Sequence, residues 1–413
     1  MMFNRTRVSF LVAGAMMMMS GTAAASGFAL IEQSASGMGN AFAGGAAGAE
    51  DASTVFFNPA GMSNIQGRQL VVALHAIKPS AKFSNNGSFG ALGTDNGGDA
   101  GSLALVPNFY YVADINEQWK YGVGVNSPFG LKTEYSTTWI GRNLAIKSDL
   151  QTININPSIS YKMNDTVSLG VGIDAQYAKA ELTKDGGALG VVKVTGNDWS
   201  YGANVGALFQ ANNDTRVGVA YRSYIKHTLK GDVNFSAAPP YNGTGSADLE
   251  VPDSISLSFF NTVSPKWEVM GDITWTKWSS FKNLDVTRTS GTTFPGEPTP
   301  LSHTTENWSN TYRYSLGATH RYNDEWKARI GVALDRAPVT DQYRTPRIPD
   351  NDRTWLALGG QYKMSAAGAF DVGYAHLFVK DSAMNQAVQA GVNVIGNYKN
   401  SVDILSVQYT HNF

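Results

Sequence analysis

The sequence contains stretches in which apolar and polar side chains alternate strictly over nine or more residues. Residues 152–161 read TININPSISY, and residues 167–177 place Val, Leu, Val, Ile, Ala and Tyr on one face against Ser, Gly, Gly, Asp and Gln on the other. The same pattern occupies residues 199–210 and 326–334. A period of two is that of a β-strand. Strands of about 9–11 residues that are apolar outward and polar inward are typical of transmembrane barrels, whereas soluble sandwiches use shorter strands with less aromatic ends.

Short and long connections separate these strands in strict alternation. The short ones lie at residues 116–118, 164–166, 212–214, 264–266, 323–325 and 365–368. The long ones lie at residues 80–101, 132–144, 183–195, 232–246, 284–306, 337–351 and 382–397. Outer-membrane barrels have short periplasmic turns and longer extracellular loops. The sequence therefore predicts an all-β fold, a 14-stranded antiparallel transmembrane β-barrel in the bacterial outer membrane with both chain ends on the periplasmic side.

The first residues have the layout of a secretory signal peptide. Arg5 and Arg7 precede an apolar stretch at residues 8–19, and Ala23-Ala24-Ala25 supplies a cleavage site. We expect residues 1–25 to be removed, with Ser26 as the mature start. No later stretch holds 18 consecutive apolar residues, so helical membrane spans are not expected.

Composition excludes several other classes of protein. The chain has no cysteine, so neither disulfides nor thiolate metal sites are expected, and we predict no metal and no cofactor. A net charge of −1 with 16% charged residues argues against a nucleic-acid partner. Low charge, 43 glycines and 11% aromatic residues suit a surface that does not face water everywhere.

Residues 26–66 show no alternation and precede the predicted barrel of residues 67–413. They include GMGNAFAGGAAGAEDASTVFFNPAG, which is not a nucleotide loop because Phe42 stands where the dinucleotide fingerprint needs glycine and no Walker lysine follows. A barrel of eight strands has an interior that side chains fill, whereas one of sixteen to eighteen strands has an aqueous channel. A barrel of fourteen strands falls between these cases, so its lumen would leak if nothing filled it. We therefore predict that this segment is an N-terminal plug, or hatch, inside the lumen.

Several motifs, in order along the chain, resemble the FadL-like family of outer-membrane transporters of long-chain fatty acids and other hydrophobic compounds. They are SGF at 26–28, SASGMGNAFAG at 34–44, AEDASTVFFNPAG at 49–61, NSPFGLKTEY at 126–135, TININPSISY at 152–161, TWTKWSSF at 274–281 and IPDNDRTWL at 348–356. The resemblance implies a hatched barrel, a hydrophobic groove among the extracellular loops and a deeper pocket touched by the N-terminus. It also implies passive uptake of hydrophobic molecules with lateral exit through the wall.

The resemblance further implies roles for individual residues. Those that match the N-terminal pocket residues are Ser26, Gly27 and Phe28, and those that match the hatch motif are Asn58, Pro59 and Ala60. Lys184 matches a base that would bind a carboxylate, although it could equally be a solvated loop lysine. The hatch motif could equally be a turn without a functional role. A second base is expected near residues 293–297, where the chain reads TFPGE. Its absence leaves aromatic or aliphatic hydrocarbons open as alternative substrates.

The wall opening has support in the sequence itself. Pro128 falls within the third predicted strand, residues 120–131, and cannot donate a ladder hydrogen bond. Unpaired backbone facing lipid is costly, so a kink containing Asn126 and Pro128 should turn inward. The alternative is that Pro128 ends a strand, and Pro157 within another alternating stretch shows that proline is not unique to this place.

Functions other than transport fit the sequence less well. Catalysis is not expected, because the histidines lie on different predicted elements and no G-x-S-x-G elbow is present. The histidines are residues 75, 227, 303, 320, 376 and 411. A general diffusion porin would need no plug, and the long loops could serve a phage or an adhesin. Expected partners of this predicted monomer are its hydrophobic substrates, outer-membrane lipids and lipopolysaccharide, and the barrel-assembly machinery through the C-terminal Phe413.

Overall fold

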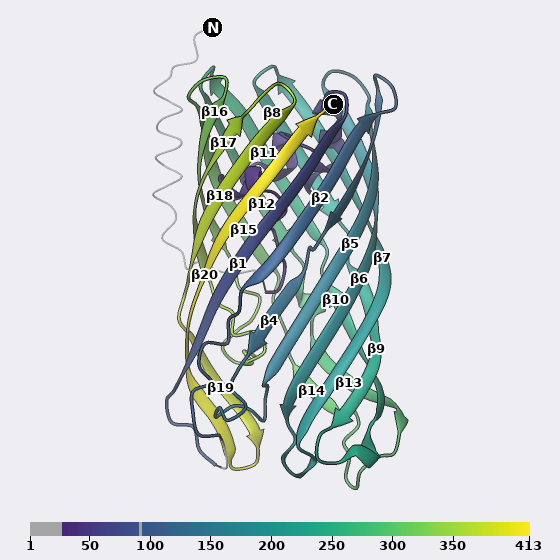
Figure 1. The fold of residues 1–413 in the computed structure, drawn as a ribbon, viewed down its shortest axis with the longest axis vertical. Helices are drawn as coiled ribbons and strands as arrows, with labels where there is room; N and C mark the ends of the chain where they lie inside the picture. Colours follow the sequence, from purple (N-terminus) through teal and green to yellow (C-terminus); the bar gives the residue numbers. More distant parts are fainter. Residues whose placement is uncertain (1–26, 91–92) are drawn as a thin grey trace.

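The wall of the molecule is one antiparallel sheet that closes on itself. The structure, a computed structural model, describes residues 27–90 and 93–413. β1 (Gln69–Asn85) pairs with β20 (Val392–Asn412) on one side and with β2 (Ala104–Asp114) on the other, so the first and last strands join. The strands run tilted around a tall barrel (Figure 1). This confirms the predicted antiparallel barrel.

Six pairs of consecutive strands lie end to end, which leaves fourteen wall segments from the twenty strands of the sheet. The pairs are β3 (Trp119–Asn126) with β4 (Gly130–Glu134), β8 (Thr215–Arg222) with β9 (Ile225–Phe235), β10 (Gly243–Val251) with β11 (Ser254–Ser264), β12 (Trp267–Thr276) with β13 (Asn283–Gly291), β14 (Ser302–Thr305) with β15 (Thr311–Arg321), and β18 (Gly368–Val379) with β19 (Ser382–Gln389). The uninterrupted strands are β1, β2, β5 (Lys147–Lys162), β6 (Val167–Asp185), β7 (Val191–Asn212), β16 (Trp326–Asp335), β17 (Arg353–Lys363) and β20. The predicted number of fourteen is therefore confirmed.

All six predicted short turns join neighbouring strands at one end of the barrel, the upper end in Figure 1. The predicted extents of several long connections are wrong. Residues 183–195 belong mostly to β6 and β7, and residues 232–246 mostly to β9 and β10, with one-turn helices η2 (Gly187–Leu189) and η3 (Pro239–Tyr241) at the tips. The strands continue beyond the lipid-facing region because their inner faces pack on one another, with Val192, Val233 and Phe235 buried.

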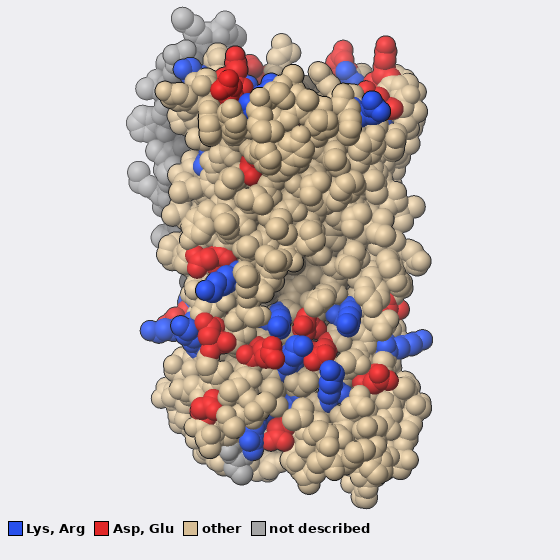
Figure 2. All heavy atoms as spheres, viewed as in Figure 1, with Lys and Arg blue, Asp and Glu red and all other residues tan. Residues whose placement is uncertain are grey.

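The outer surface carries a belt suited to lipid. Figure 2 shows a broad zone with almost no charged side chains between the short-turn end and a dense charged band below it. Aromatic ring pairs border this zone: Trp119 with Tyr161 (4.6 Å between ring centroids) near the short turns, and Tyr177 with Trp199 (5.4 Å) at the other side. Such girdles mark the two membrane interfaces. No helix among the described residues is long and apolar enough to cross a membrane.

The segment before β1 lies inside the barrel near the short-turn end (Figure 1). It forms the short helices α2 (Ala35–Met38), α3 (Gly45–Gly48) and α4 (Thr54–Phe57) and the 3₁₀ helix η1 (Pro59–Asn64). α2 contacts β17 and β18, α3 contacts β8 and β11, and η1 contacts β5, β6 and β7. The segment thus touches the wall around its circumference.

Glycines on the inner face of the wall make room for this segment. A Cβ on Gly170 of β6 would lie 2.3 Å from the Ala60 nitrogen, and one on Gly206 of β7 would lie 2.0 Å from the Asn58 Oδ1. Gly218 and Gly331 are equally close to the hatch backbone. The hatch and the wall therefore approach to backbone contact, which only glycine permits.

Candidate functional site

The wall is incomplete between β2 and β4. β3 pairs with β2 only as far as Phe109↔Val125, and β4 pairs with β5. Among the described residues no pairing joins β4 to β2, so residues 104–108 of β2 keep one unpaired edge. Pro107 lies in that edge and has no N–H that needs a partner. The face seen in Figure 2 is hollowed near mid-height, above the place where β4 is labelled in Figure 1.

Residues 127–129 form the break between β3 and β4. The registers Asn126↔Asn154 and Gly130↔Gln151 place three residues opposite two on β5, which is the geometry of a bulge. The side chain of Thr152 donates to the Phe129 carbonyl at 2.6 Å and accepts from its amide at 3.1 Å. Pro128 stands in this break, between two strands and not within one strand over residues 120–131 as predicted, and the side chain of Asn126 is buried.

The N-terminal segment pairs with the kink. The Leu30 amide donates to the Pro128 carbonyl at 2.8 Å, the Gly130 amide donates to the Phe28 carbonyl at 2.9 Å, and an antiparallel bridge joins Ala29 to Phe129 between them. Residues 28–30 therefore act as a short extra strand on the inner side of the kink. They satisfy backbone groups that the bulge removes from the wall ladder.

Phe28 is enclosed by aromatic rings. Its centroid lies 4.8 Å from Trp278, 5.7 Å from Phe281 and Trp308, and 6.0 Å from Phe129. Trp278 belongs to the one-turn helix η4 (Trp278–Ser280), and both tryptophans lie where the wall segments are interrupted, at residues 277–282 and 306–310. The interruptions thus direct large side chains into the lumen around the N-terminus.

Gly27 anchors the same segment. Its φ is +62°, and a Cβ there would lie 2.6 Å from Cζ3 of Trp308. Its amide donates to Asp350 Oδ2 at 3.0 Å, and Arg353 donates to Asp350 Oδ1 at 3.1 Å. A left-handed backbone and the adjacent ring both favour glycine at this position.

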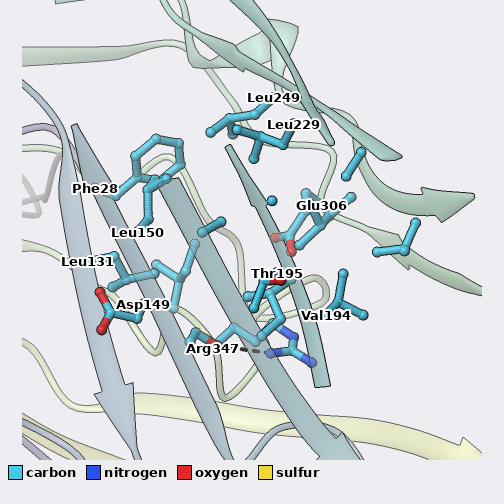
Figure 3. A pocket seen from close by; sticks show the side chains of 18 of the residues that line it. Phe28, Leu131, Asp149, Leu150, Val194, Thr195, Leu229, Leu249, Glu306 and Arg347 are labelled. Atoms are coloured by element: carbon cyan, nitrogen blue, oxygen red, sulfur yellow. Dashed lines mark hydrogen bonds between the residues drawn. The ribbon is translucent and has the colours of Figure 1, made fainter. Parts of the chain in front are cut away.

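A deep pocket of about 760 Å³, its open mouth included, lies beside Phe28 (Figure 3). Its lining is mostly aliphatic and comes from β4, β5, β6, β7, β9, β10 and β13. The labelled apolar side chains point into it from several strands: Phe28, Leu131, Leu150, Val194, Leu229 and Leu249. This size and lining match a site for one apolar molecule.

Two ionisable residues on connecting segments face the deep pocket. Glu306 accepts from Trp308 Nε1 at 2.9 Å, and burial raises the pKa of its carboxyl to about 8, against smaller opposing effects of that hydrogen bond and of Arg347. Arg347 donates to Ser148 Oγ at 2.9 Å and to the Leu144 carbonyl at 3.1 Å, and burial lowers its pKa to about 10. At neutral pH the pocket therefore holds a cationic guanidinium beside an uncharged carboxyl group.

Lys184 does not join Phe28 at the deep pocket. It lies at the end of β6 rather than in a loop, with Nζ 3.4 Å from Ser302 Oγ. It lines an outer groove of about 670 Å³ together with Phe235, Phe294 and Leu301, and Arg347 lines both this groove and the deep pocket. Glu297 of the TFPGE stretch is ion-paired with Arg288.

An inner cavity of about 1060 Å³ lies on the other side of the N-terminal strand. Ala29, Leu30 and Ile31 line it from the N-terminal segment, Phe56 and Phe57 from the hatch, and Pro128 and Phe129 from the kink. The strand at residues 28–30 thus separates the deep pocket from a cavity that reaches the kink.

Asn58 fixes the hatch to the wall. Its Nδ2 donates to the Ala46 carbonyl at 2.7 Å and to the Ala207 carbonyl of β7 at 3.0 Å, and its Oδ1 accepts from the Ala60 amide at 3.0 Å. Pro59 occupies the first position of η1, where its missing N–H costs nothing. Asn58, Pro59 and Ala60 are all buried in this junction.

The structure thus places Phe28 at the deep pocket with Gly27 next to it against Trp308, Asn126 and Pro128 at the kink, and the hatch motif nearer the short-turn end of the barrel. Ser26 and the expected signal peptide lie outside the described residues. Sequence reasoning missed Arg347, Glu306 and the aromatic cage. The signal that could have indicated the basic side of the pocket is the group of three arginines in and just before the IPDNDRTWL motif, at positions 344, 347 and 353.

Comparison with known proteins gives concordant results. The family described as outer membrane protein transport protein (OMPP1/FadL/TodX) matches residues 16–413. The long-chain fatty acid transport protein of Salmonella typhi is 32% identical over 91% of this chain and 92% of its own. A solved FadL homologue from Pseudomonas aeruginosa superimposes with a TM-score of 0.86 at 25% identity, over 94% of this chain and 100% of its own.

The toluene transporter TbuX of Ralstonia pickettii shares the fold, with a TM-score of 0.68 at 18% identity over 91% of this chain and 98% of its own. These findings confirm the resemblance drawn from the sequence motifs and the outer-membrane location. The chain belongs to the outer membrane protein transport protein (OMPP1/FadL/TodX) family.

Proposed function

We propose that this protein takes up long-chain fatty acids across the outer membrane by passive diffusion, without catalysis. In this proposal residues 1–25 are a signal peptide, residues 26–66 the hatch and residues 67–413 the barrel, which works as a monomer. The single observation that carries it is the series of cavities from the extracellular hairpins to the wall gap: outer groove, deep pocket and inner cavity.

The substrate would enter from outside and leave sideways. The outer groove shares Leu182, Val194, Val286 and Arg347 with the deep pocket, so a chain can pass from one to the other. Residues 28–30 then block the way to the inner cavity and the kink. Displacing this strand joins the cavities and leads the substrate to the unpaired edge of β2, where it reaches lipid without crossing the hatch.

Release requires such a change of shape. Burying about fourteen methylenes at ~0.8 kcal/mol each yields roughly 11 kcal/mol before the costs of ordering. A rigid pocket would hold the substrate too long. Movement of the N-terminal strand weakens binding without an energy source, and removal of the substrate inside the cell sets the net direction.

The cations support an acidic substrate. Within the described part of the chain, Arg347 forms no ion pair, and Lys184 hydrogen-bonds to one side chain, through the hydroxyl of Ser302. A carboxylate would find charge-assisted donors there. Gly27 and Phe28, with Ser26 ahead of them, would form the side of the pocket that moves.

Uncharged hydrocarbons are a second candidate, because the deep pocket is aliphatic over most of its lining. Competition among oleate, a long alkane and toluene for the purified protein separates the two. We expect oleate to displace both others; equal or stronger binding of toluene or the alkane would favour the hydrocarbon alternative.

Phe413, which is 62% exposed beside Arg68, would present the C-terminal strand to the barrel-assembly machinery.

A further inference from the structure

A continuous row of polar side chains crosses the outside of the barrel at one edge of the lipid belt. The strand registers place Gln151 of β5, Lys179 of β6, Asn197 of β7 and Lys230 of β9 next to one another. All four side chains are exposed, while their chain neighbours Thr152, Ala178, Gly196 and Leu229 are buried on the inner face. The row therefore faces outward, not into the lumen.

The row lies where lipid headgroups meet the barrel. Two residues further along β6 and β7 toward the membrane lie Tyr177 and Trp199, whose rings pack 5.4 Å apart and belong to the outer girdle. Tyr201, the next outward residue of β7, is 71% exposed. Aromatic side chains at this depth lie at the level of the headgroups. The lysines stand directly outside that level.

Lys179 and Lys230 differ from the other lysines around them. Lys147 and Lys193 are both ion-paired with Glu181, and Lys226 is ion-paired with Asp248. Within the described part of the chain, neither Lys179 nor Lys230 forms an ion pair. One strand separates them, so their backbones are about 10 Å apart and both flexible side chains can reach one anion between them.

We propose that Lys179 and Lys230 bind the phosphate of a phosphorylated outer-leaflet lipid whose acyl chains lie against Tyr177 and Trp199. Two converging ammonium groups supply the charge, and Asn197 between them supplies an amide donor. A lipid fits better than a soluble phosphate because the row is an outward, convex surface whose neighbouring side chains face hydrocarbon. Gln151, at one end of the row, pairs with Gly130 of β4, so a lipid bound at Lys179 would lie two strands from the wall gap.

The test compares two double variants that remove the same charge. K179Q/K230Q neutralises the proposed site. K82Q/K399Q neutralises a cross-strand pair of exposed lysines on β1 and β20, in the extracellular extension and away from the girdle. Each full-length protein is purified in detergent, checked for folding by heat-dependent gel mobility, and titrated by native mass spectrometry with bis-phosphorylated lipid A, with the same lipid stripped of phosphate, and with inorganic phosphate.

We expect the wild type and K82Q/K399Q to bind phosphorylated lipid A alike, and K179Q/K230Q to bind it at least about tenfold more weakly. Removal of the phosphates should reduce wild-type binding to the level of K179Q/K230Q. Equal binding by the two double variants would overturn the proposal, as would undiminished binding of the phosphate-free lipid. Displacement of the lipid by millimolar inorganic phosphate would assign the row to a soluble anion instead.

Discussion

The amide of Leu30 donates to the carbonyl of Pro128 at 2.8 Å, so the N-terminal strand and the kink in the wall form one hydrogen-bonded unit. Pro128 cannot continue the wall ladder, and its carbonyl finds a partner inside the barrel. The same contact places Phe28 in its aromatic cage and closes the way from the deep pocket to the inner cavity. In the proposed route, substrate binding and access to the wall gap would therefore depend on the same three residues, 28–30.

Binding of a fatty acid should depend on pH through Glu306. Its carboxyl is uncharged below its pKa of about 8 and becomes anionic above it, next to the position proposed for the substrate's carboxylate at Arg347. We expect oleate affinity to fall by roughly tenfold between pH 7 and pH 9, the effect of about one pKa unit of interaction. Binding of oleyl alcohol should stay level.

The variant E306Q provides the control for this prediction. It should bind oleate with nearly the same affinity across the range, because no charge appears at position 306. Isothermal titration in detergent measures both series. A pH dependence that persists in E306Q would show that another group is responsible.

The guanidinium of Arg347 should distinguish acids from neutral lipids. R347M keeps much of the side-chain volume and removes the cation, so oleate affinity should fall by about tenfold to a hundredfold, the range for a lost hydrogen bond to a charged group. Oleyl alcohol should bind within about twofold of its wild-type affinity. Fluorescent fatty-acid displacement measures both ligands, and a parallel loss for both would mean that the pocket had been disrupted as a whole.

Removing the Asn58 side chain should loosen the hatch. N58A leaves the Ala46 and Ala207 carbonyls and the Ala60 amide without their partner, at a cost of about 1–3 kcal/mol for each buried group. We expect single-channel recordings of N58A to show ion current where the wild type shows little. N64A, at the exposed end of η1, serves as the matched control and should behave like the wild type.

Small substitutions in the wall should displace the hatch in the same way. G170A would place a methyl group 2.3 Å from the Ala60 nitrogen, whereas the methyl group of G360A would lie 3.4 Å from its nearest neighbour, the Lys327 carbonyl oxygen. We expect G170A to lower the thermal unfolding midpoint by several degrees and to increase ion conductance, because overpacking costs about 1–3 kcal/mol. If G170A and G360A unfold alike and both stay closed, the close approach of hatch and wall is not a constraint.

The sequence predicted the wall well because the relevant rules are local. The alternation of apolar and polar residues predicts the strands, and residues such as Asn116 and Asn164 predict the short turns. The side chains of these two asparagines accept hydrogen bonds from the backbone amides two and three residues further along the chain. The extracellular extensions were misread as loops because glycines and lysines obscure the alternation there. Their strand character depends on packing between hairpins, which a single strand does not reveal.

The site was only partly predictable for the same reason. Phe28 and Pro128 were found through the family resemblance and the chemistry of proline. Arg347 and Glu306 lie on connecting segments that fold inward. The sequence around each residue does not indicate that its side chain enters the lumen. Lys184 was assigned to a loop, but its strand directs it to the outer groove. Side chains that meet through distant segments need the three-dimensional structure.

Uptake by the proposed route requires the N-terminal strand to separate from the kink. Ala29 and Phe129 lie directly opposite each other in an antiparallel pair, and the hydrogen bonds on either side are made by their chain neighbours. In such a non-hydrogen-bonded pair the Cα atoms are about 4.5 Å apart, a distance that a disulfide can bridge. The natural chain has no cysteine, so A29C/F129C introduces a single possible cross-link.

Uptake of radiolabelled oleate by cells that carry A29C/F129C as their only fatty-acid transporter, measured before and after reduction, is the most direct test. The reduced variant controls for loss of the Phe129 ring. We predict that uptake is abolished while the disulfide is intact and returns on reduction. Equal uptake by the fully cross-linked and the reduced protein would contradict the account.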